Sequence, residues 1–456
     1  MRNFLGVAGM LLALALPVSA SRILSVRGAN FVDPAGRIVI LRGLNLGSDA
    51  KLPPFAARAS LDPLIPWGVN AIRLVFTWEA YEPQPGAYNE DYLAGITRLI
   101  DDAWSRGVYV VVDMHQDAYS RYLGGGCGEG FPSWTVPQAD RRASPGDGTC
   151  SPMWGLWTFL APSTHRAFHR FYADDGGART AFIRAWARLA QQFKSHPGVI
   201  GYDLINEPWG DERLELAPLY EDVARAIRQA DPTAILFLEP SAPRTSLGVF
   251  QSRLPRPSFG NFAYAPHYYD PRVLILGGWR PFYKKRQLRA FRQLVDKAGE
   301  LGAPLFVGEM GDPAPTKNVR LSMEFQQGLF MSAFASFAQW SYTEAWTTVK
   351  KDGWNFEDSS VVDENGALRP NLVLLPYARK ISGVPVGQRS EAFALDVSWT
   401  DAGRGGETEL FLPEGWKVAS VSAGLRCQVR GYLAVCISKN GAASSVRLEG
   451  SMRGPP

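Results

Sequence analysis

The sequence predicts an α/β protein, a (β/α)8 TIM barrel with a small C-terminal β-sandwich domain. Three observations predict this fold: eight apolar runs alternate with helical patterns, long irregular insertions follow two of the runs, and short alternating segments follow residue 385. Strand–helix alternation indicates a parallel sheet, and eight repeats indicate closure into a barrel. The 456 residues leave room for a barrel of roughly 250 residues or more and one appended domain.

The strand candidates are continuous apolar runs, as is typical of parallel strands buried on both faces. They are Ile38–Asn45, Ala71–Phe76, Val108–Met114, Val199–Ile205, Ala234–Leu238, Asn261–His267, Pro304–Gly308 and Phe334–Trp340. A period near 3.6 predicts helices over Asp91–Arg106, Thr180–Ser195, Leu216–Gln229, Arg286–Leu301 and Leu321–Met331. The insertions, Arg121–Arg170 and Thr343–Arg369, follow the third and eighth strands, on the side where such barrels place their active sites.

Three segments are expected along the chain: a signal peptide over 1–20, the barrel over 21–384 and the sandwich over 385–456. Arg2 supplies a positive charge, Phe4–Leu16 is a short apolar run, and Val18-Ser19-Ala20 offers small residues before a cleavage site after Ala20. This layout is typical of a secretory signal peptide, and an uncleaved anchor is the alternative. We therefore expect a secreted protein, and we expect it to be a monomer.

Four cysteines fit export, because disulfides persist in oxidising compartments. Four cysteines allow three pairings. The short spacings favour one disulfide between Cys127 and Cys150 and a second between Cys427 and Cys436. A metal site is the alternative, although the chain lacks C-x-x-C spacing.

Composition and motifs exclude several function classes. The net charge is only +4, without a dense run of Lys and Arg, so nucleic-acid binding is not expected. The chain contains no G-x-G-x-x-G, P-loop or G-x-S-x-G motif. His165 and His169 have the i, i+4 spacing of helical metal ligands, but no H-E-x-x-H motif accompanies them. We predict no cofactor and no metal.

Two carboxylates carry the chemistry that the sequence predicts. Glu207 stands in Asn206-Glu207-Pro208 at the end of the fourth apolar run, and Glu309 ends the seventh. A retaining glycosidase needs an acid/base and a nucleophile about 5–5.5 Å apart. Glu207 is the predicted acid/base and Glu309 the predicted nucleophile. A loop carboxylate and a buried salt bridge are the structural alternatives for the two residues.

This ordered set of motifs resembles glycoside hydrolase family 5, over roughly residues 35–380. The family places its acid/base after strand four and its nucleophile after strand seven. The resemblance implies that Arg73 and Tyr269 contact the nucleophile, that Asn206 binds the sugar 2-hydroxyl, and that other substrate-binding positions are His115, His267 and Trp340. Glu239 ends the fifth run, where it could border the cleft, and we expect it to pair with a nearby arginine such as Arg244.

A narrower resemblance is to the endoglycoceramidases, which release an intact glycan from a glycosphingolipid. It is carried by His115-Gln116-Asp117 with Tyr119-Ser120-Arg121, by residues 49–54, and by the β-domain. It implies that Lys51 and Asp117 contact the sugar next to ceramide, which is glucose or galactose. The region 124–157 departs from the family pattern, so the glycan preference stays open.

The expected partner is a glycosphingolipid, with transient contact to a membrane or micelle surface. The segment Val273–Trp279 could form one wall of an apolar slot for ceramide, or pack inward as an ordinary loop. The alternatives to this function are another family 5 endo-β-glucanase or mannanase, which needs no apolar slot, and a non-catalytic glycolipid-binding barrel.

Overall fold

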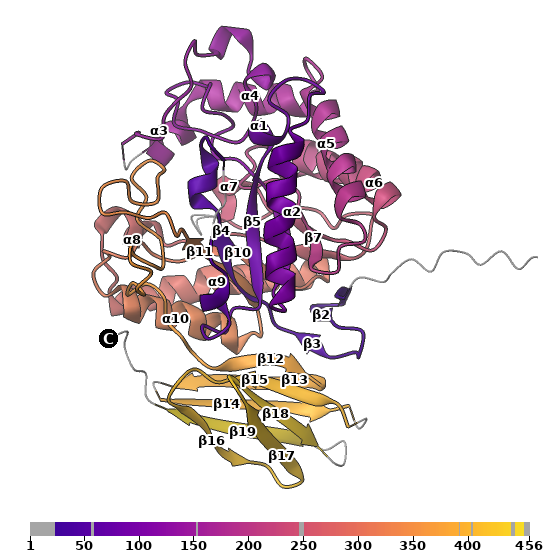
Figure 1. The fold of residues 1–456 in the computed structure, drawn as a ribbon, viewed down its shortest axis with the longest axis vertical. Helices are drawn as coiled ribbons and strands as arrows, with labels where there is room; N and C mark the ends of the chain where they lie inside the picture. The colour runs from indigo at the N-terminus through magenta and orange to yellow at the C-terminus, as the bar shows by residue number, and fades with distance from the viewer. Residues whose placement is uncertain are drawn as a thin grey trace, which may run out of the picture.

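The computed structural model describes residues 23–55, 59–151, 154–245, 250–391, 393–402, 405–438 and 443–450 (Figure 1). The predicted signal peptide, residues 1–20, lies outside the described residues. No helix in the described ranges has the length and apolar character needed to cross a bilayer.

The barrel is an eight-stranded parallel sheet with the order β10-β11-β4-β5-β6-β7-β8-β9. Parallel bridges from Tyr264 to Leu305 and from Tyr268 to Met310 join its two ends and close it. Its strands are β4 (Arg42–Leu46), β5 (Ala71–Thr77), β6 (Tyr109–His115), β7 (Val199–Asp203), β8 (Ile235–Leu238), β9 (Phe262–Tyr264), β10 (Phe306–Met310) and β11 (Ser336–Tyr342). The predicted TIM barrel is confirmed.

Helices surround the barrel, and the longer ones, α2, α4, α5, α6, α9 and α10, each bury an apolar face. In α2 this face is Tyr92, Leu93, Ile96, Leu99, Ile100 and Ala103, and the Asn89 side chain caps the helix by accepting from the Tyr92 amide. The helices are α1 (Trp78–Tyr81), α2 (Glu90–Ser105), α3 (Trp154–Leu160), α4 (Pro162–Tyr172), α5 (Ala178–Phe193), α6 (Ala217–Ala230), α7 (Ala242–Thr245), α8 (Pro271–Leu276), α9 (Lys284–Leu301) and α10 (Val319–Ser332).

Short 3-10 turns and one π turn occupy the connections. They are η1 (Ser48–Lys51), η2 (Asp62–Leu64), η3 (Ser133–Thr135), η4 (Gln138–Asp140), η5 (Glu212–Leu216, the π turn) and η6 (Pro281–Tyr283). The first insertion is therefore less irregular than predicted, since it holds η3, η4, α3 and most of α4.

The C-terminal domain is built from two antiparallel sheets. One has the order β1-β2-β3-β12-β15-β18-β17 and the other β13-β14-β19-β16. Their strands are β1 (Ser25–Arg27), β2 (Asn30–Val32), β3 (Ile38–Val39), β12 (Tyr377–Ile381), β13 (Gly383–Glu391), β14 (Ala394–Asp401), β15 (Glu407–Phe411), β16 (Trp416–Val421), β17 (Leu425–Arg430), β18 (Leu433–Ser438) and β19 (Ala443–Gly450).

The N-terminal segment departs from the prediction. The run Ile38–Asn45 is not one strand, because β3 leaves the barrel and pairs with β12, whereas β4 enters the barrel. The predicted boundary at residue 385 falls inside β13, and the sandwich includes β12 and the N-terminal strands β1–β3. The physical reason is edge pairing: three short N-terminal strands extend a sheet whose other members come from the end of the chain.

The sandwich packs against the N-terminal end of the barrel strands, below the barrel in Figure 1. The Tyr377 hydroxyl donates to the Gly68 carbonyl across 2.7 Å, and the Arg42 guanidinium lies 4.1 Å from the Tyr377 ring centroid. Gly68 has φ +76°, and a Cβ there would lie 2.5 Å from the Phe411 ring. Only glycine combines this backbone with such close approach.

Both predicted disulfides are confirmed. Cys127 and Cys150 are joined within the first insertion, and Cys427 and Cys436 join β17 to β18 as a cross-strand pair. The first disulfide also abuts the second insertion, because Asn355 donates to the Cys127 carbonyl across 3.0 Å and accepts from the Cys150 amide across 3.1 Å. The two insertions therefore meet at this disulfide.

Candidate active site

Glu207 and Glu309 meet at the C-terminal end of the barrel, although a hundred residues separate them. Glu207 follows β7, the fourth barrel strand, and Glu309 lies in β10, the seventh. Three atoms lie within 4.8 Å of one another: a carboxylate oxygen of Glu207, a carboxylate oxygen of Glu309 and a ring nitrogen of His267. An upper limit of 4.8 Å between these oxygens agrees with the roughly 5–5.5 Å typical of retaining glycosidases and is well short of the roughly 6.5–9.5 Å of inverting ones.

Glu309 is buried and held by two donors. Arg73 Nη1 lies 3.0 Å from Oε1, and the Tyr269 hydroxyl donates to Oε2 across 2.9 Å. Burial and the neighbouring carboxylates of Glu309 and Glu207 raise the pKa of Tyr269 well above its usual value, so the phenol keeps the proton that it donates. A cation and a hydrogen-bond donor therefore hold one oxygen each of the Glu309 carboxylate.

Arg73 is the centre of a buried charge network. Its guanidinium lies within 3.0 Å of Asp113, Asp203, Glu239 and Glu309, and it also donates to Asn45 and Asn206. Burial alone would lower the pKa of Arg73, but the carboxylates outweigh it and raise that pKa well above its usual value. One cation thus holds residues from four different strand ends in register.

Glu207 is the more accessible of the two acids, with 24% of its side chain exposed. Its backbone has φ +39°, a strained conformation for a non-glycine residue, and its amide donates to Glu239 Oε2 across 2.9 Å. Gln116 Nε2 donates to the carbonyls of both Asn206 and Glu207. Strain of this kind persists only where surrounding contacts enforce it, and it is concentrated at functional sites.

His267 connects the two acids. Its Nδ1 lies 2.8 Å from Glu207 and 3.5 Å from Glu309, and its Nε2 lies 3.2 Å from Glu239. Burial lowers the pKa of His267, but the carboxylates of Glu239 and Glu309 more than compensate and raise it well above its usual value. His267 is therefore a second cation, placed between the carboxylates.

The expectation for Glu239 was wrong in its partner. Glu239 pairs with Arg73 at 2.8 Å and with His267, not with Arg244. Arg244 instead lies 3.7 Å from Glu212. Glu239 points into the barrel because it ends a barrel strand, whereas Arg244 belongs to the outer α7.

A second set of predicted residues lies beside the acids. Lys51 Nζ lies 2.6 Å from Asp117 Oδ2 and 4.3 Å from the centroid of the Trp340 ring. The rings of His115 and Trp340 stack, with centroids 5.4 Å apart and an interplanar angle of 8°. Asp113 links the two sets, because Oδ2 lies 2.6 Å from His115 Nδ1 and Oδ1 lies 2.9 Å from Arg73.

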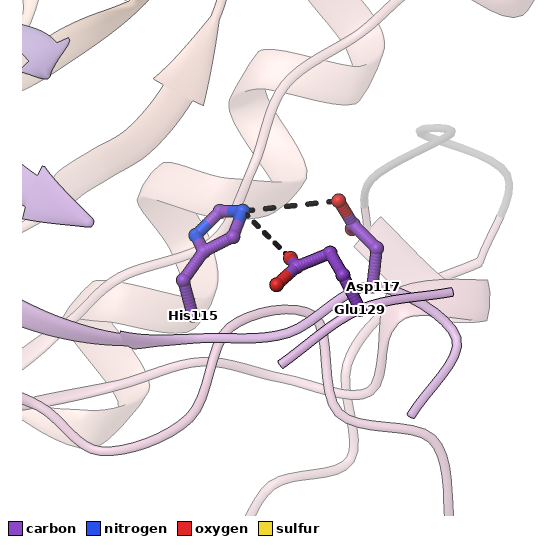
Figure 2. A group of neighbouring side chains, drawn as sticks. All are labelled: His115, Asp117 and Glu129. Atoms are coloured by element: carbon purple, nitrogen blue, oxygen red, sulfur yellow. Dashed lines mark ion pairs between the residues drawn. The ribbon is translucent and has the colours of Figure 1, made fainter. Parts of the chain in front are cut away.

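Glu129 completes this second set, and sequence analysis missed it. Figure 2 shows His115, Asp117 and Glu129 converging, with His115 Nε2 3.8 Å from each carboxylate. The backbones of Asp117 and Glu129 form an antiparallel bridge, which carries Glu129 back to the barrel. Both Glu129 oxygens are fully buried, without a hydrogen-bond partner among the described residues.

The charges of this set are unequal. Burial raises the pKa of Glu129 to about 8, which favours its neutral form near pH 7. Burial lowers the pKa of His115, but the neighbouring carboxylate of Asp113 outweighs this effect and raises that pKa to about 10. Burial raises the pKa of Asp117, but the ammonium group of Lys51 outweighs this effect, and the pKa of Asp117 falls below its usual range.

Three groups among the described residues have the ligand types and proximity that a metal ion requires: His115, Asp117 and Glu129; Glu207, His267 and Glu309; and Asp113, Asp203 and Glu239. Each group contacts a protein cation. Lys51 contacts Asp117, and Arg73 contacts Glu309 and the third group. These side chains would compete with a metal ion for the same oxygens.

The oxygen and nitrogen of the Asn206 side chain already pair with Arg73 and with the Gln116 carbonyl, so Asn206 is held firmly beside Glu207. The segment Val273–Trp279 divides: Val273 and Trp279 are buried, but the side chains between them at 274–276 are exposed.

A further acid, Glu357, accepts from Trp340 Nε1 across 3.2 Å, and burial raises its pKa to about 7.

Comparison with known proteins places the site in a family. A family model described as Cellulase (glycosyl hydrolase family 5) matches residues 32–345, which is more than half of the chain and includes both glutamates. The chain belongs to glycosyl hydrolase family 5. All ten residues predicted for catalysis or substrate binding lie within the matched region. Nine of them lie in the C-terminal half of a barrel strand or after it, and Arg73 lies nearer the start of β5.

Relatives in this family include two curated endoglycoceramidases. Endoglycoceramidase I of Rhodococcus hoagii is 30% identical over 243 residues, covering 49% of this chain and 47% of the relative. Endoglycoceramidase of Cyanea nozakii is 34% identical over 204 residues, covering 38% and 40%. The chain therefore matches less than half the length of either relative.

Solved structures share the fold across nearly the whole chain. Endo-glycoceramidase II from Rhodococcus sp., in complex with ganglioside GM3, aligns with a TM-score of 0.78 at 22% identity, covering 93% of this chain and 100% of the other. An endogalactoceramidase aligns with a TM-score of 0.71 at 24% identity, covering 94% and 100%.

Proposed function

We propose that this protein is a secreted retaining β-glycosidase that hydrolyses the bond between glycan and ceramide in glycosphingolipids. The observation that carries the proposal is the approach of the Glu207 and Glu309 carboxylates to within 4.8 Å at the open end of the barrel. Their separation suits a double displacement, because it leaves no room for a water molecule between nucleophile and sugar.

In the first step, Glu309 attacks the anomeric carbon while Glu207 donates its proton to the glycosidic oxygen. The bond between sugar and ceramide oxygen breaks, ceramide leaves as the alcohol, and the glycan is held as an ester of Glu309. In the second step, Glu207, now a carboxylate, removes a proton from water. The hydroxide oxygen bonds to the anomeric carbon, the ester bond breaks, and Glu309 is regenerated.

The neighbours of the two acids support these roles. Glu309 is the acid that contacts Arg73 and Tyr269, and these two donors hold its carboxylate in a fixed position for attack. Glu207 is more exposed, and its partner His267 can donate to its carboxylate after the proton has left. Glu239 orients Glu207 by accepting from its backbone amide.

The second set of residues supports recognition of a sugar. Trp340 offers an aromatic ring next to the acids, and Lys51 and Asp117 offer a donor and an acceptor close to it. Lys51 and Asp117 are the positions that resemble the endoglycoceramidases, and the curated relatives carry that name. We propose that both contact the sugar linked to ceramide.

Product analysis tests the proposal. The protein is incubated with lactosylceramide in detergent micelles, and the products are separated by mass. The expected products are intact ceramide and intact lactose. Release of glucose or galactose alone would refute the endo-cleavage, and no turnover of any glycolipid or aryl β-glycoside would refute the enzyme.

Comparing two kinds of substrate distinguishes the proposed function from its main alternative. A soluble β-glucan or β-mannan is the substrate expected of an endo-glucanase or mannanase of the same family, whose model carries the description Cellulase. We expect turnover of lactosylceramide and none of the polysaccharides. Glu309→Ala is the control for the non-catalytic alternative: it should abolish turnover and leave glycolipid binding measurable.

A further inference from the structure

Five large apolar side chains are exposed beside the barrel mouth, on α8, η6 and the first turn of α10. They are Leu274 (41% exposed), Ile275 (66%), Leu276 (66%), Phe282 (68%) and Leu321 (52%). Three of them are consecutive, so α8 turns an apolar surface to solvent over its whole second half. We call these five residues the docking patch. Clustered exposed apolar side chains on a folded protein mark an interaction surface.

The docking patch stands on a packed base. Val273, Trp279 and Tyr283 form a separate buried cluster, and the partly buried Phe325 packs against it. The backbone of Lys317, just before α10, pairs with Gly277 and Trp279 through hydrogen bonds of 3.0 and 2.9 Å. The loop that carries the patch is therefore anchored by its own core, and exposure of its apolar side chains is a feature of the folded state.

A rim of positive charge borders the docking patch. Arg280, Lys284, Lys285, Arg286 and Lys317 are all exposed. None of the five has an ion-pair partner within the part of the chain that the structure describes. The nearby acids Asp270 and Glu324 are instead paired with arginines of their own, Arg272 and Arg320. The rim thus presents uncompensated cations next to apolar side chains.

The docking patch is connected to the candidate active site. Asp270 caps α8, and it directly follows Tyr269, whose hydroxyl contacts Glu309. In Figure 1, α8 lies on the same side of the barrel as α3 and the loop after β11, and away from the sandwich. One short segment of chain therefore carries both a residue of the site, Tyr269, and the helix of the docking patch.

We propose that the docking patch binds an anionic lipid bilayer, with Leu274–Leu276 and Phe282 entering the interface and the cationic rim contacting phosphate headgroups. Apolar side chains flanked by Lys and Arg bind the interface in this way, and each cation near an anionic surface strengthens binding about fivefold. The purpose of docking rests on the proposed function, because a glycosphingolipid resides in a lipid layer. The binding itself does not require catalysis.

Vesicle flotation tests the docking patch without using the reaction. The probe is phosphatidylcholine vesicles with phosphatidylglycerol and no glycolipid. We expect the wild-type chain to float with these vesicles at low salt, and less at high salt. The variant with Leu274→Ser, Ile275→Ser and Leu276→Ser should bind at least tenfold more weakly. The variant with Lys284→Gln, Lys285→Gln and Arg286→Gln should bind roughly 100-fold more weakly.

The matched control is Val384→Ser with Val386→Ser, two apolar residues of the sandwich that are each 65% exposed. It should bind vesicles as the wild type does. All variants should keep their melting temperature and their turnover of a soluble aryl β-glycoside. Equal vesicle binding by wild type and the α8 variant would overturn the proposal, as would loss of binding in the sandwich control.

Two further outcomes would also overturn it. A wild-type chain that remains in solution with anionic vesicles has no such docking surface. A wild-type dimer that the α8 substitutions convert to a monomer, seen by sedimentation, would assign the docking patch to a second copy of the chain. Vesicle binding without hydrolysis of lactosylceramide would instead refute the proposed function and leave docking intact.

Discussion

The Tyr269 hydroxyl donates a hydrogen bond of 2.9 Å to Oε2 of Glu309, while Arg73 approaches the other oxygen of the same carboxylate at 3.0 Å. The two donors fix the plane of the carboxylate and stabilise its charge. Arg73 lies within β5 and Tyr269 follows β9, so the position of the carboxylate depends on both segments.

Tyr269→Phe should lower kcat on an aryl β-glycoside about 10- to 100-fold, because a hydrogen bond to a charged group contributes about 1.5–3 kcal/mol. KM and the melting temperature should change little. Tyr268→Phe is the matched control, since its hydroxyl donates to the Gln287 carbonyl and touches neither acid. Equal kcat for the two variants would remove Tyr269 from the mechanism.

Arg73→Met should destabilise the fold by about 3–5 kcal/mol, because it leaves several buried carboxylates without their cation. The measurement is the free energy of unfolding in denaturant. Arg225→Met removes an exposed pair with Asp222 at 2.9 Å and should cost about 0–1 kcal/mol. A similar cost for both variants would mean that the buried network contributes nothing beyond a surface pair.

Glu129→Gln should change how stability depends on pH. The folded-state pKa of Glu129 is raised from 4.5 to about 8, so between these values the folded chain binds more protons than the unfolded chain. Stability from this group is therefore lost as pH rises across that window. The variant should lose less stability than the wild type between about pH 5 and 8, and parallel curves from denaturant unfolding would contradict the burial of an acidic Glu129.

Replacing Cys127 and Cys150 by serine should weaken the binding of lactosylceramide more than it slows the chemical step. The disulfide contacts Asn355 of the second insertion, so its loss frees both insertions at the barrel mouth. We expect a higher KM for lactosylceramide, with kcat on an aryl β-glycoside nearly unchanged. The Cys427→Ser, Cys436→Ser variant is the control, because its disulfide lies in the sandwich, and it should leave both parameters unchanged.

The pairing of Glu207 with Glu309 was predictable because the ends of parallel barrel strands converge on one side. Seven of the eight apolar runs each overlap one barrel strand, whereas the run Ile38–Asn45 divides between β3 and β4. Both disulfides followed from the short spacings of the cysteines. Arg73, His267 and Tyr269 were found through resemblance rather than pattern, and the structure brings them to the two acids.

Other features leave no periodic signal. Glu129 reaches the site through a single backbone bridge to Asp117 inside a long loop, and nothing in its local sequence indicates that bridge. Glu239 was recognised as a strand-end acid, but its partner depends on which arginine points into the barrel. The strands β1–β3 are only two or three residues long, too short for alternation to identify them.

The pairing of β3 with β12 has a consequence for how the chain is assembled. The first strands to leave the ribosome must wait for nearly the whole barrel to be made before their sheet can be completed. Until then β3 offers an open edge, which is a template for misassembly. Deleting the sandwich would make that transient exposure permanent, so the barrel should not be obtainable as an isolated soluble fragment.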